Sequence, residues 1–115
     1  LLESMGRAED AVEEYETVVE LAPDAMEAYC NLAVALIGLG AYKQAAKVCR
    51  AGIELEPGNL ALRYNLGLAF YNLKFLEDSR SIFRSIIEEA PAGSALKPNA
   101  QTVLDRIEKK LKSTH

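Results

Sequence analysis

Side chains capable of catalysis or metal binding are few in this sequence. The two cysteines, Cys30 and Cys49, fit neither a C-x-x-C motif nor a zinc-ligand spacing. The single histidine, His115, is the last residue. The sequence has no glycine-rich phosphate loop, no H-E-x-x-H and no G-x-S-x-G. We therefore expect no enzyme activity, no cofactor and no metal ion. We interpret both cysteines as buried or half-buried thiols in a reducing compartment, which favours a cytoplasmic location.

A group of carboxylates near the N-terminus is the remaining candidate for a metal site. It comprises Glu9, Asp10, Glu13, Glu14 and Glu16. This spacing spreads the carboxylates around a helix, and no Asp- and Gly-rich loop organises them. We therefore interpret the group as a solvated helix face.

Charge is unevenly distributed along the chain, whose formal net charge is −4. Residues 1–25 carry eight acids and one base, whereas residues 97–115 carry five bases and two acids. The acidic start disfavours contact with nucleic-acid phosphates. No run of 18 apolar residues is present, so we expect no membrane insertion.

An internal repeat organises most of the sequence. Pro23, Pro57 and Pro91 are spaced 34 residues apart. Positions of matching size keep the same step: large apolar Leu2, Leu36 and Phe70, small Ala11, Ala45 and Ser79, and medium or aromatic Tyr15, Cys49 and Phe83. A period of 20–50 residues held at this many positions indicates a repeat architecture.

The residues between these positions predict pairs of amphipathic helices. The expected helices are Ala8–Leu21, which follows a short helical tail at Leu1–Met5, then Met26–Leu39, Tyr42–Leu55, Leu60–Leu73 and Leu76–Glu89. We expect short turns at Gly6, Gly40 and Lys74. Asp24 with Glu27 forms a capping box at the start of Met26–Leu39, and Asn59 can cap the helix Leu60–Leu73.

The repeat ends at Pro91, and a different pattern follows. Residues 92–98 read as a loop, and Asn99 is a candidate N-cap. An apolar stripe then predicts an amphipathic helix within residues 99–115; it consists of Ala100, Val103, Leu104, Ile107 and Leu111. Such a helix suits the end of a helical stack, where it covers the last apolar face.

The repeat resembles the tetratricopeptide repeat. The run from Tyr29 to Leu36, followed by Gly40, Ala45, Cys49 and Pro57, matches that family's spacing, and the run from Arg63 to Phe70, followed by Ser79, Phe83 and Pro91, matches it again. The resemblance implies an all-α, right-handed α-solenoid of antiparallel helical hairpins with a C-terminal capping helix. About two and a half repeats would fill residues 1–91: a partial one in 1–25 and full ones in 26–59 and 60–91.

The chain opens partway through the first helix of a repeat, so we expect it to be cut from a longer protein. Solenoids need about three units for stability. An open apolar edge at the N-terminus would then allow the chain to self-associate.

The resemblance also implies where a partner would bind, because the first helices of successive repeats line a concave groove in this family. The residues that this assigns to the groove are Glu27, Cys30, Asn31, Val34, Ile37, Tyr64, Asn65, Leu68, Tyr71 and Asn72. Four of these residues are expected on helix faces that the hairpin core does not use: Val34, Ile37, Leu68 and Tyr71. Tyr71 is expected to be the dominant contact. Asn31 and Asn65 either bond a peptide backbone or tie neighbouring helices together.

These features predict a protein-interaction scaffold, a co-chaperone-like adaptor that holds a peptide or protein segment. The chaperone-binding type of the family clamps a C-terminal carboxylate with lysines and an arginine. Here Cys30 and Val34 hold one pair of those positions and Ala61 and Asn65 another, so we exclude that type. Two alternatives remain: a recruiting arm of a multidomain enzyme, and an RNA-binding helical repeat, against which the 34-residue step and acidic start argue.

Overall fold

The structure, a computed structural model, describes residues 2–113, with side chains described from residue 7 onward. That part of the chain forms six helices and no strand. The helices are α1 (Leu2–Leu21), α2 (Met26–Gly38), α3 (Tyr42–Leu55), α4 (Leu60–Asn72), α5 (Leu76–Glu89) and α6 (Leu96–Ser113). The predictions made for the side chains of Leu1, Leu2 and Met5, and for His115, lie outside the described residues.

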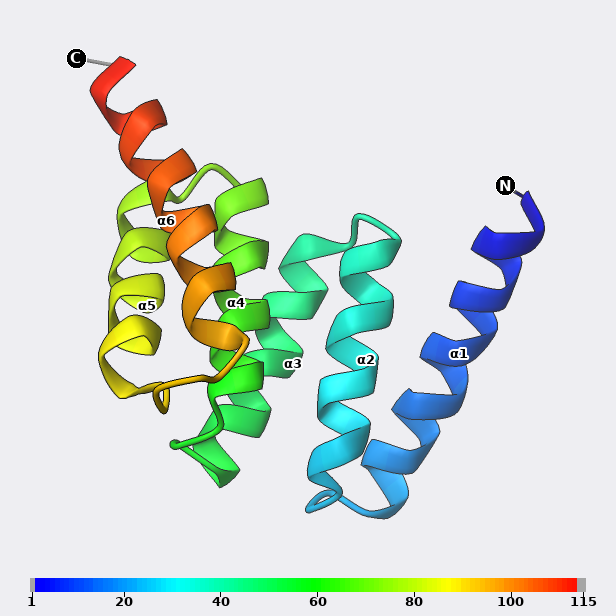
Figure 1. Ribbon diagram of the computed structural model, residues 1–115. Coiled ribbons are helices and arrows are strands. Elements are labelled where there is room, and N and C mark those ends of the chain that lie inside the picture. Colours follow the sequence, from blue (N-terminus) through cyan, green and yellow to red (C-terminus); the bar gives the residue numbers. More distant parts are fainter. Residues whose placement is uncertain (1, 114–115) are drawn as a thin grey trace.

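The helices follow one another as neighbours in a curved stack (Figure 1). The pairs α2–α3 and α4–α5 form two hairpins, α1 packs against α2, and α6 packs against α5. In addition, α2 contacts α4 and α4 contacts α6, whereas the backbones of α1, α3 and α5 do not approach one another in the described part. The curvature therefore places α2, α4 and α6 on the concave side. The predicted all-α solenoid of helical hairpins is confirmed.

Small residues let the two helices of a hairpin approach closely, as Gly67 of α4 does opposite Phe83 of α5. Ser79 and Phe83 of α5 are fully buried. A Cβ built on Gly67 of α4 would lie only 2.7 Å from Cε2 of Phe83, so the glycine allows the two helices to approach closely. The Ser79 hydroxyl donates a hydrogen bond of 2.9 Å to the Gly67 carbonyl. Ala45 and Cys49, one period earlier in α3, are also fully buried.

The turns within the two hairpins lie where the sequence predicts them. Gly40 has a φ of +78° and Lys74 a φ of +72°, so both adopt the left-handed conformation that ends many helices. Before the second hairpin, the Asn59 Oδ1 atom accepts a hydrogen bond from the Leu62 amide at 3.0 Å. This contact confirms Asn59 as the N-cap of α4.

Two predictions near the N-terminus are wrong, although α2 begins at Met26 as predicted. No turn forms at Gly6, because α1 is continuous from Leu2 to Leu21; a glycine inside a helix costs only about 1 kcal/mol relative to alanine and does not end it alone. The Asp24 capping box is also absent, since Ala25 is the N-cap of α2 and no side chain bonds there. The Tyr29 hydroxyl instead donates to the Pro23 carbonyl at 2.8 Å and fixes this connection.

The last helix begins earlier than predicted. It starts at Leu96, within the expected loop 92–98, so Asn99 lies inside the helix and is not its N-cap. The Ser94 hydroxyl accepts a hydrogen bond of 3.2 Å from the Leu96 amide and supplies a cap. Pro98 lies in the first turn of α6. Amide groups in the first turn of a helix make no intrahelical hydrogen bond, so the lack of an amide hydrogen in proline costs nothing there.

The capping role predicted for this helix is confirmed. Leu104 and Ile107 of α6 are buried in one apolar cluster with Phe83 and Ile86 of α5. Leu104 lies one period after Phe70, so α6 occupies the position of a first helix in a further unit. Burying each such side chain contributes about 1.5–3 kcal/mol to stability.

Candidate functional site

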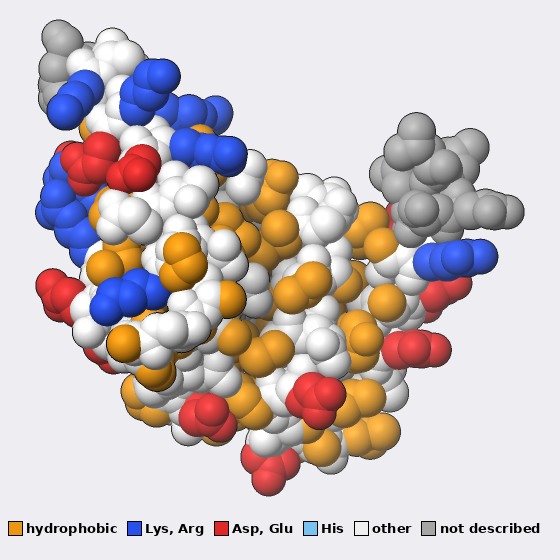
Figure 2. Space-filling model, in the orientation of Figure 1, with side chains coloured by type: hydrophobic (Ala, Val, Ile, Leu, Met, Phe, Trp, Pro, Cys, Tyr) orange, Lys and Arg blue, Asp and Glu red, His pale blue; other side chains and the backbone are white. Residues whose placement is uncertain are grey.

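The concave side of the stack is the candidate site, lined by α2, α4 and α6. Figure 2 shows it as a hollow between α6 and α1, with hydrophobic side chains over its floor. Acidic side chains lie along the lower edge in this view, and Lys and Arg side chains gather on the upper part of α6 (Figure 2). The hollow therefore combines an apolar floor with edges of opposite charge.

The residues predicted on α2 are mostly accessible. Val34 is 58% exposed, which makes it one of the most exposed large apolar side chains of the molecule. Glu27 is exposed, and Asn31 is half-buried. Cys30 and Ile37 are half-buried because they pack against the apolar core of the first hairpin and α4. Val34 is thus the apolar groove residue that α2 leaves open.

The apolar residues predicted on α4 are not free for a ligand as expected. Tyr64, Leu68 and Tyr71 are half-buried because they pack against the apolar cluster of α5 and α6. The Tyr64 ring meets the Phe83 ring edge to face, with centroids 5.3 Å apart. The prediction that the core does not use the faces of Leu68 and Tyr71 is wrong, since both pack against the apolar cluster that α6 extends.

Lys110 of α6 is a groove residue that the sequence reasoning missed. Its ammonium nitrogen lies 4.7 Å from the centroid of the Tyr71 ring, within range of a cation–π interaction. Tyr71 is therefore partly covered by its own chain and is not the free aromatic anchor that was predicted. The sequence gives no sign of this contact, because Lys110 lies outside the 34-residue repeat.

The two groove asparagines differ from Asn72 in their hydrogen bonding. The Asn72 amide donates to the Leu68 carbonyl at 2.9 Å. The side-chain amides of Asn31 and Asn65, residues that lie one period apart and are half-buried, make no hydrogen bond to the described part of the chain. The alternative in which these two amides tie neighbouring helices together is therefore not supported. Both amides have free donors and acceptors on successive concave helices.

The two cysteines have the burial expected of them. Cys49 is fully buried, and this burial raises the pKa of its thiol to about 12. Burial also raises the pKa of the half-buried Cys30 thiol, and the nearby Glu56 and Glu27 carboxylates add to the increase, whereas a hydrogen bond with Asn59 opposes it. Neither thiol is activated as a nucleophile, because a reactive cysteine needs a lowered pKa.

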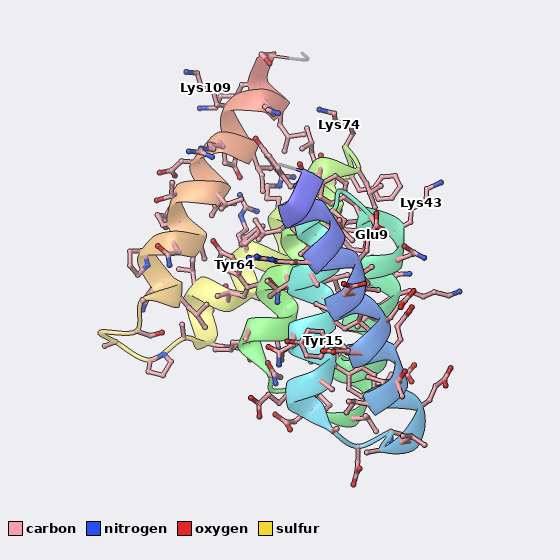
Figure 3. All side chains as sticks on the ribbon, turned by 90° about the vertical axis from the view of Figure 1, so that its right-hand side faces the viewer. Glu9, Tyr15, Lys43, Tyr64, Lys74 and Lys109 are labelled. Carbon is pink, nitrogen blue, oxygen red and sulfur yellow. The ribbon has the colours of Figure 1, made fainter. Side chains whose placement is uncertain are left out.

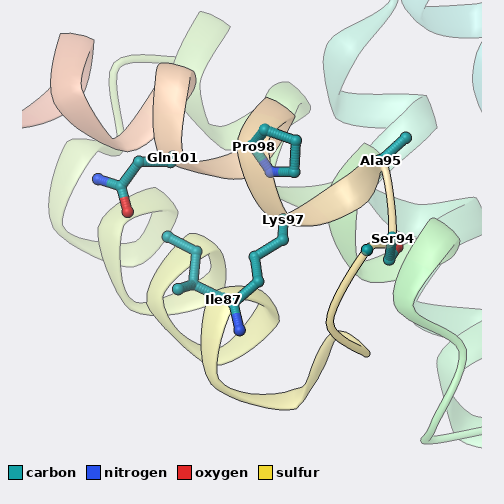
Figure 4. A pocket seen from close by; sticks show the side chains of 7 residues that line it. Ile87, Ser94, Ala95, Lys97, Pro98 and Gln101 are labelled. Carbon is teal, nitrogen blue, oxygen red and sulfur yellow. The ribbon is translucent and has the colours of Figure 1, made fainter.

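Outside the concave side, the described surface has a further depression and no metal-binding cluster. A shallow depression between α5 and α6 is lined by Ile87, Lys97 and Gln101, among others (Figure 4). Within residues 2–113, no cluster of three or more His, Cys, Asp or Glu side chains could hold a metal ion. None of the described helices is both long and apolar enough to cross a membrane.

Comparison with known proteins agrees with this architecture. Residues 1–59 match one sequence profile described as tetratricopeptide repeat, and residues 36–104 match a second profile of the same description. Each match spans more than half of the chain, so the protein belongs to the tetratricopeptide-repeat family. No curated protein sequence matches it significantly.

Solved structures with the same fold include three that cover most of the chain. The first tetratricopeptide-repeat domain of human RPAP3 is 21% identical, with a TM-score of 0.84 over 96% of this chain and 84% of that one. The Sgt2 domain from Aspergillus fumigatus is 20% identical, with a TM-score of 0.81 over 96% and 72%. PcrH is 20% identical, with a TM-score of 0.81 over 91% and 81%. At these identities the likeness is one of fold.

Proposed function

We propose that this protein is an interaction scaffold that binds an extended or helical segment of another protein along its concave side. Val34 supplies the accessible apolar contact, and Asn31 and Asn65 bond the backbone of the bound segment. Leu68 and Tyr71 form the wall next to α6. The protein acts by binding a partner on this surface.

The observation that carries this proposal is the pair of unbonded asparagine amides. Each amide offers two donor hydrogens and one acceptor oxygen. When a ligand covers these amides, they exchange hydrogen bonds with water for hydrogen bonds with the ligand backbone. Binding therefore costs little free energy of desolvation at these two side chains. Their spacing of one period places one amide on each of two adjacent helices, as a ligand lying across α2 and α4 requires.

Proteins of the same fold bind partners of this kind. PcrH was solved in complex with the chaperone-binding region of PopD. The second tetratricopeptide-repeat domain of human RPAP3, 24% identical to this chain, was solved with the HSP70 peptide SGPTIEEVD. These complexes support a peptide or protein segment as the partner class here.

The ligand of this chain should differ from an acidic C-terminal peptide. The groove positions on α2 and α4 carry Glu27 and no lysine or arginine among the ten residues assigned to them. An acidic ligand would therefore gain no ion pair from α2 or α4. We infer recognition by apolar side chains and backbone, with affinity that depends only weakly on salt.

Selection from a phage-displayed random-peptide library against the full chain tests this proposal. A selected peptide is then titrated calorimetrically into three variants. Val34→Asp and Asn65→Ala should each weaken binding by about 1–3 kcal/mol. Leu55→Asp is the matched control, because Leu55 is 52% exposed on α3, outside the concave side. A peptide whose affinity falls with Leu55→Asp and not with Val34→Asp would contradict the proposed site.

A further inference from the structure

A furrow runs along the convex side of the stack, between α1 and α3. Residues of α2 form its apolar floor, and the two neighbouring helices form its walls. The floor includes Leu32 and Leu36, the α1 wall Glu16 and Val19, and the α3 wall Lys47 and Val48. The backbones of α1 and α3 do not approach one another, so the furrow separates the two helices.

The α1 wall of this furrow is acidic. Four exposed glutamates follow one another at intervals of four, three and four residues: Glu9, Glu13, Glu16 and Glu20. Residues three and four apart lie on the same face of a helix, so these carboxylates form a single row and repel one another. None of the four forms an ion pair within residues 7–113. Cations on a ligand would relieve this repulsion.

The α3 wall carries the opposite charge. Lys43, Lys47 and Arg50 are exposed and are spaced four and three residues apart, so they form a row of cations. No acidic side chain in the described part of the chain lies within ion-pairing distance of this row. Figure 3 shows Glu9 of α1 and Lys43 of α3 on the same side of the molecule, to the right. The apolar floor therefore lies between a row of carboxylates and a row of cations.

The equivalent furrow one period later, between α3 and α5, is closed by side chains of the chain itself. Arg63 of α4 donates hydrogen bonds to the Ser85 hydroxyl at 3.3 Å and to the Glu89 carboxylate at 2.7 Å, both on α5. The Arg50 guanidinium lies 5.2 Å from the centroid of the Phe70 ring of α4 and covers it. Two arginines thus occupy the second furrow.

The first furrow has no such closure. Tyr29 holds the position of Arg63, one period earlier, and its hydroxyl donates to the Pro23 carbonyl and not to α3. Ala51 holds the position of Ser85 and has no polar group in its side chain. Among the residues that the structure describes, no ion pair joins α1 or α2 to α3. The first furrow is therefore open between its charged walls.

A further repeat of the same solenoid would not fill this furrow. The furrow between α3 and α5 lies inside the stack, with α1 and α2 before it and α6 after it, and none of these helices enters it. Each repeat of a solenoid contacts mainly its neighbours along the stack and does not cross the convex side. The occupant of the first furrow must therefore come from outside the helical stack.

We propose that the furrow between α1 and α3 binds an amphipathic helix of another protein. This helix has an apolar stripe against the floor, lysine or arginine on the flank beside α1, and glutamate or aspartate on the flank beside α3. A helix lying parallel to α1 has charges at the same spacing as both walls, and the row from Glu9 to Glu20 extends over roughly 16 Å. The site is additional to the concave groove and does not depend on it.

The probe is a hydrocarbon-stapled helical peptide with leucines along one stripe, lysines on one flank and glutamates on the other. Titrated into the full isotope-labelled chain, it should shift the amide resonances of Val19, Lys47 and Val48. Two control peptides keep the leucines and carry either lysines or glutamates on both flanks. Each should bind more than about tenfold more weakly, because one of the two walls then repels it. Equal affinities for the three peptides, or no shift with any of them, would overturn the proposal.

Variants of the chain separate this site from the concave groove. Lys47→Glu should weaken binding of the mixed-charge peptide about tenfold, whereas Val34→Asp should leave it unchanged. Lys109→Glu is the matched control, because it makes the same change in net charge on α6, on the opposite side of the molecule in Figure 3. Equal effects of the two lysine variants would overturn the proposal.

Two other occupants are also tested. Binding that is lost with Val34→Asp and kept with Lys47→Glu would place the peptide in the concave groove and overturn the proposal. Sedimentation showing a dimer that Lys47→Glu dissociates would do the same, because a second copy of the chain would then fill the furrow.

Discussion

The two concave helices α2 and α4 carry matching residues in different environments. Val34 and Leu68 lie one period apart, yet Val34 is 58% exposed and Leu68 packs beneath α6. The difference arises from the next concave helix in each case. Helix α6 extends the apolar cluster over Leu68 of α4, whereas α4 leaves Val34 of α2 exposed. The position in the repeat thus determines the type of residue. The packing of the next helix determines whether that side chain is buried in the core or remains accessible to a ligand.

Removing α6 should produce the largest change. Deleting residues 96–115 exposes the apolar cluster around Phe83 and uncovers Leu68 and Tyr71. Loss of two large buried side chains, Leu104 and Ile107, alone costs about 3–6 kcal/mol. Urea denaturation of the shortened chain should show this loss. An unchanged midpoint would mean that α6 does not stabilise the last hairpin.

The pair Leu68→Asp and Val34→Asp tests the comparison at single positions. Leu68→Asp places a carboxylate in the apolar cluster, so we expect a loss of about 2–4 kcal/mol. Val34→Asp changes an exposed side chain and should alter stability by less than about 0.5 kcal/mol. Thermal unfolding measured by circular dichroism checks both. Equal losses of stability in the two variants would contradict the view that Leu68 is packed in the core and Val34 is not.

Glycine substitutions test the close packing of the last hairpin. Gly67→Ala should destabilise the protein by about 1–3 kcal/mol, because its Cβ would lie 2.7 Å from Cε2 of the buried Phe83 ring. Gly38→Ala is the control, since nothing lies within 4 Å of a Cβ there. It should be neutral or stabilise by up to about 1 kcal/mol. A stabilising Gly67→Ala would show that α4 and α5 have room to separate.

The smallest expected effect concerns the thiols. Cys30 is half-buried and Cys49 fully buried, so an alkylating reagent should modify Cys30 first at neutral pH. Burial raises the pKa of Cys49 to about 12, so the folded state keeps this thiol neutral. Its contribution to stability is present below the ordinary thiol pKa of about 8.5 and declines as pH rises toward 12. Mass spectrometry of peptides from the alkylated protein measures the order of reaction. Alkylation of Cys49 before Cys30 would contradict the prediction.

Much of the fold could be predicted from the sequence. The 34-residue step located both hairpins, and residues with a local role, such as Gly40 and Asn59, marked their turns and caps correctly. Gly6 misled the prediction, because a glycine can end a helix or lie within one. Here Gly6 lies within α1, which runs without a break from Leu2 to Leu21.

The site could be predicted only in part. The period placed the groove residues on the correct helices, but it could not show which of them pack against their neighbours. Tyr71 is covered by Lys110 of α6, a contact between residues far apart in the sequence and outside the repeat. The free amides of Asn31 and Asn65 required the structure as well, because the same residue type bonds the Leu68 carbonyl at Asn72.

The most direct test of the concave binding surface is chemical-shift mapping of the isotope-labelled chain with a peptide selected against it. We predict that the side-chain amide resonances of Asn31 and Asn65 shift strongly, together with the backbone amide of Val34. Shifts confined to α3 and α5, with both asparagine side chains unchanged, would contradict the account.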